Sequence, residues 1–462
     1  MTALATAFDA LARVQPVRIV GTVAALRGLT ILVDDLPVPI GSLVSIEAGF
    51  RDNCSRIYAE VVGFTREHAI LMTLGQTTGI SPGDRVTCEE VTQTAAVGPR
   101  LLGRVVDGLA RPIDDKGPIH DCVHLPISPE PIRALRRRRI TQPLYTGIRA
   151  IDLMTTLGRG QRMGLFAGPG VGKSTLLSTI AKRTSADVNV IALIGERGRE
   201  VKDFIEHSLG PEGMARSVVV VATGDESPLL RLRAAKLACT AAEYFRSRGL
   251  DVLLMMDSIT RFAQAQRQVG LSVGEPPATK GYTPSVFANM ALLLERAGAL
   301  EVETVQDGVS KKAGSITGLY TILVEGDDMT EPIADAARGI LDGHIILSRK
   351  LAQKSHYPAI DVLDSVSRVQ NDVTTPEHGA ARRQWSKLLA NYREVEDLVQ
   401  IGAYARGSNP DADVAIDLNR AINDVLRQAG GDDTPFDKSL AIMQRIAKES
   451  TDAVARATKT KR

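Results

Sequence analysis

A glycine-rich segment in the first half of the chain has residue types and spacing suited to binding phosphate. Residues 167–175 read AGPGVGKST. Glycine has no Cβ, so backbone N–H groups in such a segment can approach phosphate oxygens closely. Lys173 would supply a charge for the β- and γ-phosphates, and Ser174 a hydroxyl for Mg²⁺. The segment therefore predicts a P-loop for ATP with Mg²⁺, lined by Gly168, Pro169, Gly170, Val171, Gly172, Lys173, Ser174 and Thr175.

The residues on both sides of this segment support the same interpretation. RMGLFA (162–167) has the composition of a buried strand, and LLSTIAKR (176–183) has helical spacing. A strand, a loop and a helix in this order are the context that the motif requires, and the helix N-terminus adds positive potential. Ala167 replaces the first glycine of the strict pattern. The alternative, a glycine-rich turn with a chance lysine, leaves both flanks unexplained.

A carboxylate follows another apolar segment. DVLLMMD (251–257) ends in Asp257. An acid at the carboxyl edge of a parallel sheet lies beside the loops that follow neighbouring strands. We expect Asp257 to hold Mg²⁺ through water. The alternative is that Asp257 caps a helix beginning in SITRFAQAQR.

A second carboxylate follows VNVIALI (188–194), in the sequence GERGREV. Glu196 would then lie at the same sheet edge, where it can orient or deprotonate an attacking water. Arg197 is placed to stabilise charge or to organise the loop. A charged surface turn is the alternative, and the nearby P-loop favours catalysis.

The elements that must position these residues change along the chain. Six short runs between 17 and 90 alternate with turn residues, which predicts a small all-β barrel or sandwich. From about 103, apolar strands alternate with helical stretches, which indicates an α/β fold with a buried parallel or mixed sheet. Helical segments dominate after 376. We expect a β-barrel domain in 1–95, an ATPase core in 96–375 and a helical domain in 376–462.

Composition excludes several classes of protein. The chain has 462 residues and a formal net charge of +2, too balanced for nucleic acid to be the default partner. We expect no membrane span and no secretory signal, and hence a cytoplasmic protein. A zinc site or disulfide framework is not expected, because the cysteines are widely spaced: Cys54, Cys88, Cys122 and Cys239.

With these segments in place, the sequence resembles the flagellum-specific ATPases of type III protein export, a branch of the rotary ATPase alpha/beta family. GERGREVKDFIE and EGDDMTEPIADAARGILDGHI point to the export branch, and the matching stretches cover most of 103–417. The resemblance implies a RecA-like core between an N-terminal β-barrel and a C-terminal helical domain. It also implies that Glu196 is the catalytic carboxylate.

The resemblance assigns three further residues. It implies that Tyr357, in HYPAID, stacks on adenine and that Arg368 is an arginine finger presented to a neighbouring subunit. It places Arg296, in LLLERAG, as a sensor of the γ-phosphate. From the residues alone, the preferred interpretation of Tyr357 is an ordinary half-buried aromatic, and that of Arg368 is a local partner of Asp364.

An assembly and its partners are implied as well. The resemblance predicts a homohexamer with sites between subunits and the loop 274–285 facing the pore. The expected partners are a stator-like regulator, a stalk protein, export chaperones and a membrane export gate, with peripheral association at the cytoplasmic face of the inner membrane and no nucleic acid.

Three segments depart from the family pattern. The arginine-rich run 132–140 reads as a solvated linker, with an acidic lipid or protein contact as the alternative. Residues 299–312 are longer and more polar than the family loop, and we expect a mobile surface excursion. The chain before the first strand is short, which leaves a regulator contact there open.

Four other functions compete with flagellar export. They are the ATPase of a non-flagellar secretion system, the catalytic subunit of a proton-translocating ATP synthase, a Rho-like RNA translocase, and a ring subunit that binds ATP without hydrolysing it. RNA-binding barrels present stacking aromatics among basic residues, whereas residues 17–90 contain only Phe50, Tyr58 and Phe64. Glu196 and Lys173 argue against the non-hydrolysing subunit.

Overall fold

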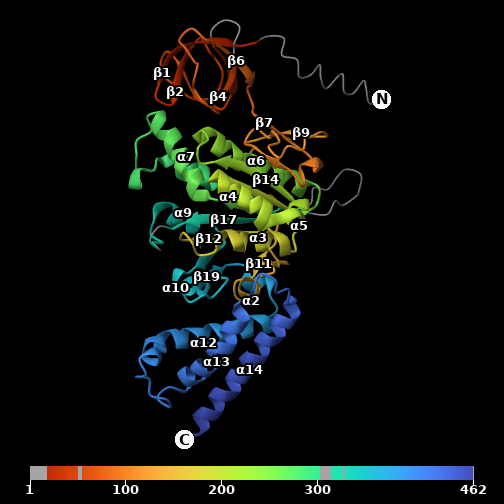
Figure 1. Cartoon of the computed structure of the whole chain (residues 1–462), viewed down its shortest axis with the longest axis vertical. Coiled ribbons are helices and arrows are strands. Elements are labelled where there is room, and N and C mark those ends of the chain that lie inside the picture. Colours follow the sequence, from red (N-terminus) through yellow and green to blue (C-terminus); the bar gives the residue numbers. More distant parts are fainter. Residues whose placement is uncertain (1–17, 50–54, 302–313, 325, 327, 461–462) are drawn as a thin grey trace, which may run out of the picture.

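The chain forms an elongated molecule with three parts along its long axis (Figure 1). The computed structural model describes residues 18–49, 55–301, 314–324, 326 and 328–460. A β-barrel lies at one end, an α/β sheet in the middle and a group of helices at the other end. Residues 302–312 of the predicted loop 299–312, and residues 1–17 of the segment before the first strand, lie outside the described residues.

The first part is a closed barrel of strand order β1-β2-β5-β4-β3-β6. Its strands are β1 (Val20–Arg27), β2 (Thr30–Asp34), β3 (Leu43–Ala48), β4 (Ser55–Phe64), β5 (Ala69–Thr73) and β6 (Arg85–Glu90). Its interior is filled by aliphatic side chains such as Ile31, Val44, Ile46 and Leu71. Closure leaves no unpaired strand edge, and the sequence-based prediction of a barrel is confirmed.

The middle part is a nine-stranded mixed sheet of order β19-β18-β12-β17-β15-β13-β14-β8, with β16 paired to β17. Its bounds are β8 (Val105–Val106), β12 (Arg162–Ala167), β13 (Val188–Glu196), β14 (Ser217–Thr223), β15 (Asp251–Asp257), β16 (Gly298–Ala299), β17 (Ser315–Leu323), β18 (Gly343–Leu347) and β19 (Ile360–Ser367). All neighbours pair in parallel except β18 with β19 and β16 with β17. The ends of β12, β13 and β15 therefore share one edge, as the sequence predicted.

Helices cover both faces of this sheet because its strands are apolar on both sides. One face packs on α6 (Pro228–Ser247), α7 (Ile259–Ser272), α8 (Pro284–Leu294) and α9 (Pro332–Ile340). The other packs on α2 (Arg149–Met154), α3 (Lys173–Arg183), α4 (Gly198–Asp203), the π-helix η3 (Phe204–Leu209) and α5 (Gly210–Ala215). The remaining short elements are η1 (Pro99–Leu101), η2 (Ala134–Arg136), η4 (Thr279–Gly281), α10 (Arg349–Gln353), α11 (Gln370–Val373), and the strand pairs β7 (Thr94–Val97) with β9 (Val123–Pro126) and β10 (Pro143–Leu144) with β11 (Leu157–Gly158).

Three helices form the last part: α12 (Pro376–Gln400), α13 (Pro410–Leu426) and α14 (Phe436–Thr460). Trp385 of α12 is fully buried, and its indole N–H donates to the Met443 carbonyl of α14 at 3.1 Å. The apolar side chains of these helices belong to the same cluster as α2 and one face of the sheet. The helical part therefore packs directly on the core.

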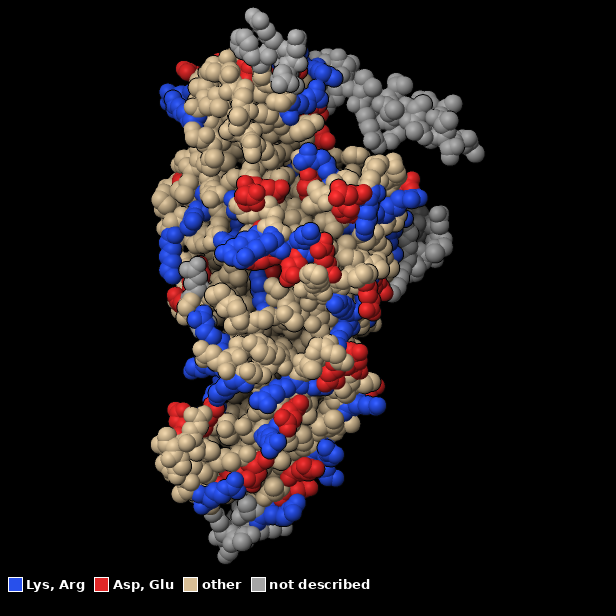
Figure 2. All heavy atoms as spheres, in the orientation of Figure 1, with Lys and Arg blue, Asp and Glu red and all other residues tan. Residues whose placement is uncertain are grey.

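Charges of both signs are interspersed over the face shown in Figure 2, which agrees with the small net charge. Among the described residues, no helix is long and apolar enough to cross a membrane.

Candidate active site

The P-loop joins β12 to α3 as the motif predicted. Gly170 and Gly172 have φ angles of 77° and 89°, a region that favours glycine. Gly172 is the N-cap of α3 and has no side chain with which to cap it. The first N–H groups of the helix therefore remain available to an anion, where the helix dipole also favours negative charge.

Lys173 lies between the two predicted carboxylates. Its Nζ is 2.5 Å from Asp257 Oδ1 and 3.6 Å from Glu196 Oε1. The Thr321 hydroxyl also donates to Asp257 Oδ1, at 2.6 Å, so two neighbours fix this carboxylate. Tertiary structure thus brings three predicted site residues from three strand ends into contact.

Asp257 is not the N-cap of the helix that follows it. Ser258 has that position, and its hydroxyl accepts a hydrogen bond from the Arg261 N–H. The Asp257 side chain is 7% exposed and faces the P-loop. The capping alternative is therefore excluded by the geometry.

Glu196 ends β13 and is partly buried. Burial, followed by the charge of Asp257, raises the pKa of its carboxyl, and Lys173 opposes the shift. Arg261 also lowers this pKa, and it lies beneath the strand end, where a Cβ on Gly195 would be 2.9 Å from the Arg261 side chain. The sequence analysis missed Arg261, although SITR directly follows the Asp257 strand.

The other predicted arginines lie elsewhere. Arg197 is the N-cap of α4 and its exposed guanidinium lies 3.3 Å from Glu200, so it is outside the Lys173 cluster. Arg368 is exposed and follows β19, where Ser367 pairs with Gly343 at the start of β18. Because β18 is parallel to β12, Arg368 lies at the sheet edge opposite its own P-loop. The alternative pairing with Asp364 is not formed, since Asp364 binds Arg393.

Arg296, predicted as a γ-phosphate sensor, does not lie at the P-loop of its own chain. This residue precedes β16, which pairs with the start of β17, and so it lies at the edge opposite the P-loop. Its guanidinium is 12% exposed, binds Glu243 at 2.6 Å and donates to the carbonyls of Ile127 and Lys236. Because these contacts hold the Arg296 guanidinium, it does not reach a γ-phosphate bound in its own subunit.

A cavity of about 440 Å³ adjoins the P-loop and contains Tyr357. A Cβ on Gly172 would be 3.4 Å from the Tyr357 ring, which is 45% exposed. The cavity has the size and the largely apolar lining of a small-molecule site. Three lining residues were missed by the sequence analysis: Arg183 of α3, and Gln428 and Gly430 of the loop between α13 and α14. No local signal marks them.

The arginine-rich run is only partly a solvated linker. Arg137 donates to the carbonyls of Glu295 and Ala297 and to the Glu295 carboxylate, and Arg139 binds Asp372. The run pairs through its backbone with the segment 299–301: the Arg138 N–H donates to the Ala299 carbonyl, and the Glu301 N–H donates to the Arg136 carbonyl. The linker interpretation is therefore corrected for Arg137, whose role is to bind the core.

Comparisons with known proteins identify the family. Three family models match the chain: the ATP synthase alpha/beta beta-barrel domain at 23–89, the ATP synthase alpha/beta nucleotide-binding domain at 147–367, and the T3SS EscN ATPase C-terminal domain at 374–445. The third favours the export branch over the catalytic subunit of an ATP synthase.

Full-length relatives agree. A flagellum-specific ATP synthase of Pseudomonas aeruginosa is 47% identical over 416 residues, covering 90% of each chain. A type 3 secretion system ATPase of Xanthomonas euvesicatoria is also 47% identical, over 93% of this chain and 94% of its own. The assembled ATPase EscN of enteropathogenic E. coli superposes with a TM-score of 0.83 at 40% identity, over 92% of this chain and 100% of that one. A further structure, of EscN in complex with its central stalk EscO, superposes with a TM-score of 0.82.

The barrel, the RecA-like core and the helical domain match these relatives over nearly the whole chain. The chain therefore belongs to the ATP synthase alpha/beta family, in the branch of the type III export ATPases.

Proposed function

We propose that this chain hydrolyses ATP to drive protein export through a type III apparatus, and that the apparatus is flagellar. The observation that carries the proposal is the contact of Lys173 with Asp257 and Glu196 at the P-loop. In the proposed cycle, hydrolysis releases cargo from export chaperones and feeds it to a membrane export gate.

The P-loop residues bind the triphosphate. Backbone N–H groups of 170–175 cradle the phosphates, and Lys173 neutralises the β- and γ-phosphates. An incoming γ-phosphate competes with Asp257 for the Lys173 ammonium group. Tyr357 stacks on the adenine in the adjoining cavity, opposite the loop of Gln428 and Gly430.

The donor set fits Mg²⁺. The Ser174 hydroxyl and the Asp257 carboxylate are oxygen ligands of the kind that this ion prefers. Among the described residues, no group of three or more His, Cys, Asp or Glu gathers to hold an ion alone. That agrees with an ion held by Ser174, by Asp257 through water and by the substrate phosphates. When bound, Mg²⁺ would neutralise charge on the phosphates.

Glu196 is the proposed general base. Its raised pKa strengthens it as a base, and its place beside Lys173 puts it near the γ-phosphate position. The roles of Arg197 and Arg261 are to order the loop around Glu196, because Arg197 begins α4 and Arg261 lies beneath Gly195.

Catalysis requires a ring. Arg368 lies at the edge opposite its own P-loop, so it can serve as an arginine finger only in a neighbouring subunit's site. Repeated head-to-tail contacts close into rings, and we propose a homohexamer with the loop 274–285 facing its pore. A stalk protein would enter the pore and a stator-like regulator would bind the N-terminal part, at the cytoplasmic face of the inner membrane.

The ATPase rate per subunit, measured against protein concentration, tests the shared site. We expect the rate to rise steeply as rings assemble, since an arginine finger contributes roughly 10³–10⁵ in rate. A rate per subunit that is constant across dissociation contradicts the proposal. RNA should not stimulate the rate, which separates this function from a Rho-like translocase. Deletion of the gene should abolish motility if the apparatus is flagellar, and leave motility intact if it is a non-flagellar secretion system.

A further inference from the structure

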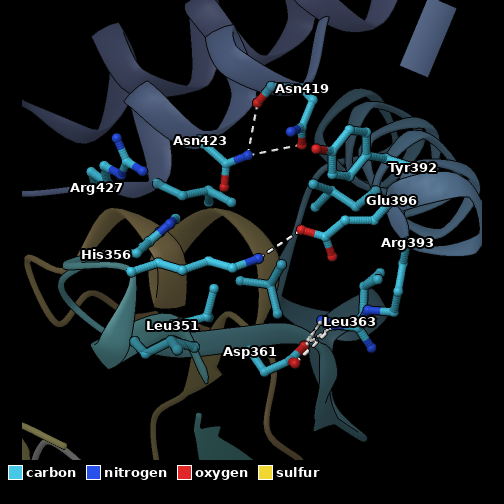
Figure 3. Close-up of a pocket in the computed structure, with 15 residues that line it drawn as sticks. Leu351, His356, Asp361, Leu363, Tyr392, Arg393, Glu396, Asn419, Asn423 and Arg427 are labelled. Atoms are coloured by element: carbon cyan, nitrogen blue, oxygen red, sulfur yellow. Dashed lines mark hydrogen bonds and ion pairs between the residues drawn. The ribbon is translucent and has the colours of Figure 1, made fainter. Parts of the chain in front are cut away.

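A second cavity, of about 260 Å³, lies between the core and the C-terminal helices (Figure 3). We call it the interdomain pocket. One wall is formed by α10, the segment after it and β19, and the other by α12 and α13. Its labelled lining residues include His356, Asp361, Tyr392, Arg393, Glu396, Asn423 and Arg427.

One cation of this pocket has no ion pair. Lys354 binds Glu396 at 2.6 Å, and Arg393 binds Asp361 at 2.6 Å and Asp364 at 3.1 Å. Arg427 is the remaining charged lining residue, and its exposed guanidinium has no carboxylate partner among the described residues. That guanidinium is therefore available to an anionic occupant.

His356 provides a second, independent sign of a ligand. The residue is 5% exposed, and its ring nitrogens have no hydrogen-bond partner within the described part of the chain. Burial and the nearby Arg427 lower its pKa to about 4, so the ring is neutral at pH 7 and offers one donor and one acceptor. Figure 3 shows His356 and Arg427 at the same end of the pocket. Buried polar groups in folded proteins are nearly always paired.

The remaining lining sets the size and shape of the occupant. Aliphatic side chains make up much of the remaining wall, beside Tyr392, Asn419 and Asn423; they are Leu351, Ile360, Val362, Leu363, Leu389 and Leu426. The volume lies just below the range of about 300–1,000 Å³ that drug-sized ligands occupy. The pocket thus suits a compact organic anion with an apolar body.

Two segments line both this pocket and the cavity beside the P-loop that contains Tyr357. We call the latter the adenine cavity, because the proposed function places adenine there. His356 lines the interdomain pocket, whereas Tyr357 lines the adenine cavity. In the same way Arg427 lines the former and Gln428 the latter. The Gln428 N–H donates to the Tyr357 carbonyl at 2.9 Å, which joins the two segments. A ligand held between His356 and Arg427 therefore acts on the residues that flank the adenine position.

We propose that the interdomain pocket binds a compact organic anion between His356 and Arg427, and that its occupancy changes the affinity of the adenine cavity for nucleotide. The first half of this proposal stands on the pocket alone. The second rests on the proposed function, because it requires ATP at the P-loop.

Binding is tested by calorimetry on the full chain without nucleotide, with benzoate as the carboxylate probe and phenyl phosphate as the phosphate probe. The phosphate arm uses the Lys173→Ala variant, so that the P-loop does not contribute. We expect one of the two anions to bind, and Arg427→Gln to weaken it at least about tenfold. Arg420→Gln, on the exposed face of the same helix, is the matched control and should bind as the wild type does. The neutral analogue benzamide should bind at least about tenfold more weakly than benzoate.

The proposal is overturned if the wild type and Arg427→Gln bind each anion with equal affinity. It is also overturned if neither benzoate nor phenyl phosphate binds to the wild type. His356→Phe, which fills the pocket with an apolar ring, should abolish binding, and unchanged binding to a folded variant overturns it as well. Coupling is tested by measuring the affinity for a non-hydrolysable Mg–ATP analogue with and without the bound anion. By linkage the anion and the nucleotide must change each other's affinity by the same factor. A factor of one overturns the coupling, whereas failure of nucleotide to bind at all refutes the proposed function and leaves the anion result standing.

Discussion

Substitution of Glu196 by glutamine isolates its proposed role as the base. The change removes one charge and keeps the shape of the side chain. Lys173 retains its closer partner, Asp257, at 2.5 Å, whereas Glu196 is 3.6 Å away. The variant should therefore fold, and its affinity for Mg–ATP should change by only a few-fold.

The expected loss is in turnover. A positioned general base contributes roughly 10²–10⁴ in rate, which corresponds to about 2.7–5.4 kcal/mol in the activation barrier. Steady-state hydrolysis gives kcat, and titration with a fluorescent nucleotide gives the affinity. Glu200→Gln is the matched control, since Glu200 lies in the first turn of α4, four residues after Glu196, and pairs with Arg197 rather than with Lys173. We expect its kcat to remain close to that of the wild type.

The pH profile gives an independent check. Burial and Asp257 raise the pKa of Glu196, and only the ionised form accepts a proton from water. The rate should therefore rise with pH through a midpoint above 4.5, the ordinary value for a glutamate, and this limb should be lost in Glu196→Gln. A variant with normal affinity and wild-type kcat would refute the assignment of the base.

Four further predictions follow from the same geometry. Arg368→Ala should lower kcat by roughly 10³–10⁵. Mixing Arg368→Ala subunits with Lys173→Ala subunits should restore part of the activity, because some sites in a mixed ring then combine an intact Lys173 with an intact Arg368 of the neighbour. If rings shown to be mixed recover no activity, Arg368 is not delivered in trans. Tyr357→Ala should weaken nucleotide binding by about 1–3 kcal/mol through lost base stacking, whereas Tyr357→Phe should bind normally; equal affinities in a fluorescence titration would argue against stacking. Trp385→Ala should lower the free energy of unfolding by about 3–5 kcal/mol, because the side chain is fully buried; chemical denaturation with Trp385→Phe as the milder comparison measures it. His356 should titrate near pH 4 in the NMR spectrum of the folded chain, and since an unfolded histidine binds its proton near pH 6.5, stability should fall as the pH drops from about 6.5 to about 4; a midpoint near 6.5 in the folded chain would contradict the burial argument.

Patterns within short segments were enough to predict most of the fold. The strands predicted at 162–167 and 251–257 coincide with β12 and β15, because uninterrupted apolar runs bounded by polar residues identify buried strands. The barrel was predicted as a barrel or sandwich, and only strand order separates the two. That order depends on pairing between distant segments, such as β1 with β6, which no local pattern encodes.

The active site divides in the same way. The P-loop is a contiguous segment, so its sequence identifies it. The meeting of Lys173 with Asp257, 84 residues away, was predicted because the ends of parallel strands share one sheet edge. Arg296 was assigned by a motif match, which does not say at which edge of the sheet a residue lies, and β16 puts it at the edge opposite the P-loop of its own chain.

What the sequence determined by itself is therefore the local chemistry: a loop for phosphate, a lysine, and two acids at strand ends. The tertiary structure alone decided which distant segments complete the site. Arg183, Gln428 and Gly430 reach the adenine cavity, and His356 and Arg427 meet behind it, only because the helical part packs on the core. Contacts between two packed parts join residues that are far apart in the sequence. Residues more than 70 positions apart share no periodic pattern, so no sequence pattern could have predicted that they meet.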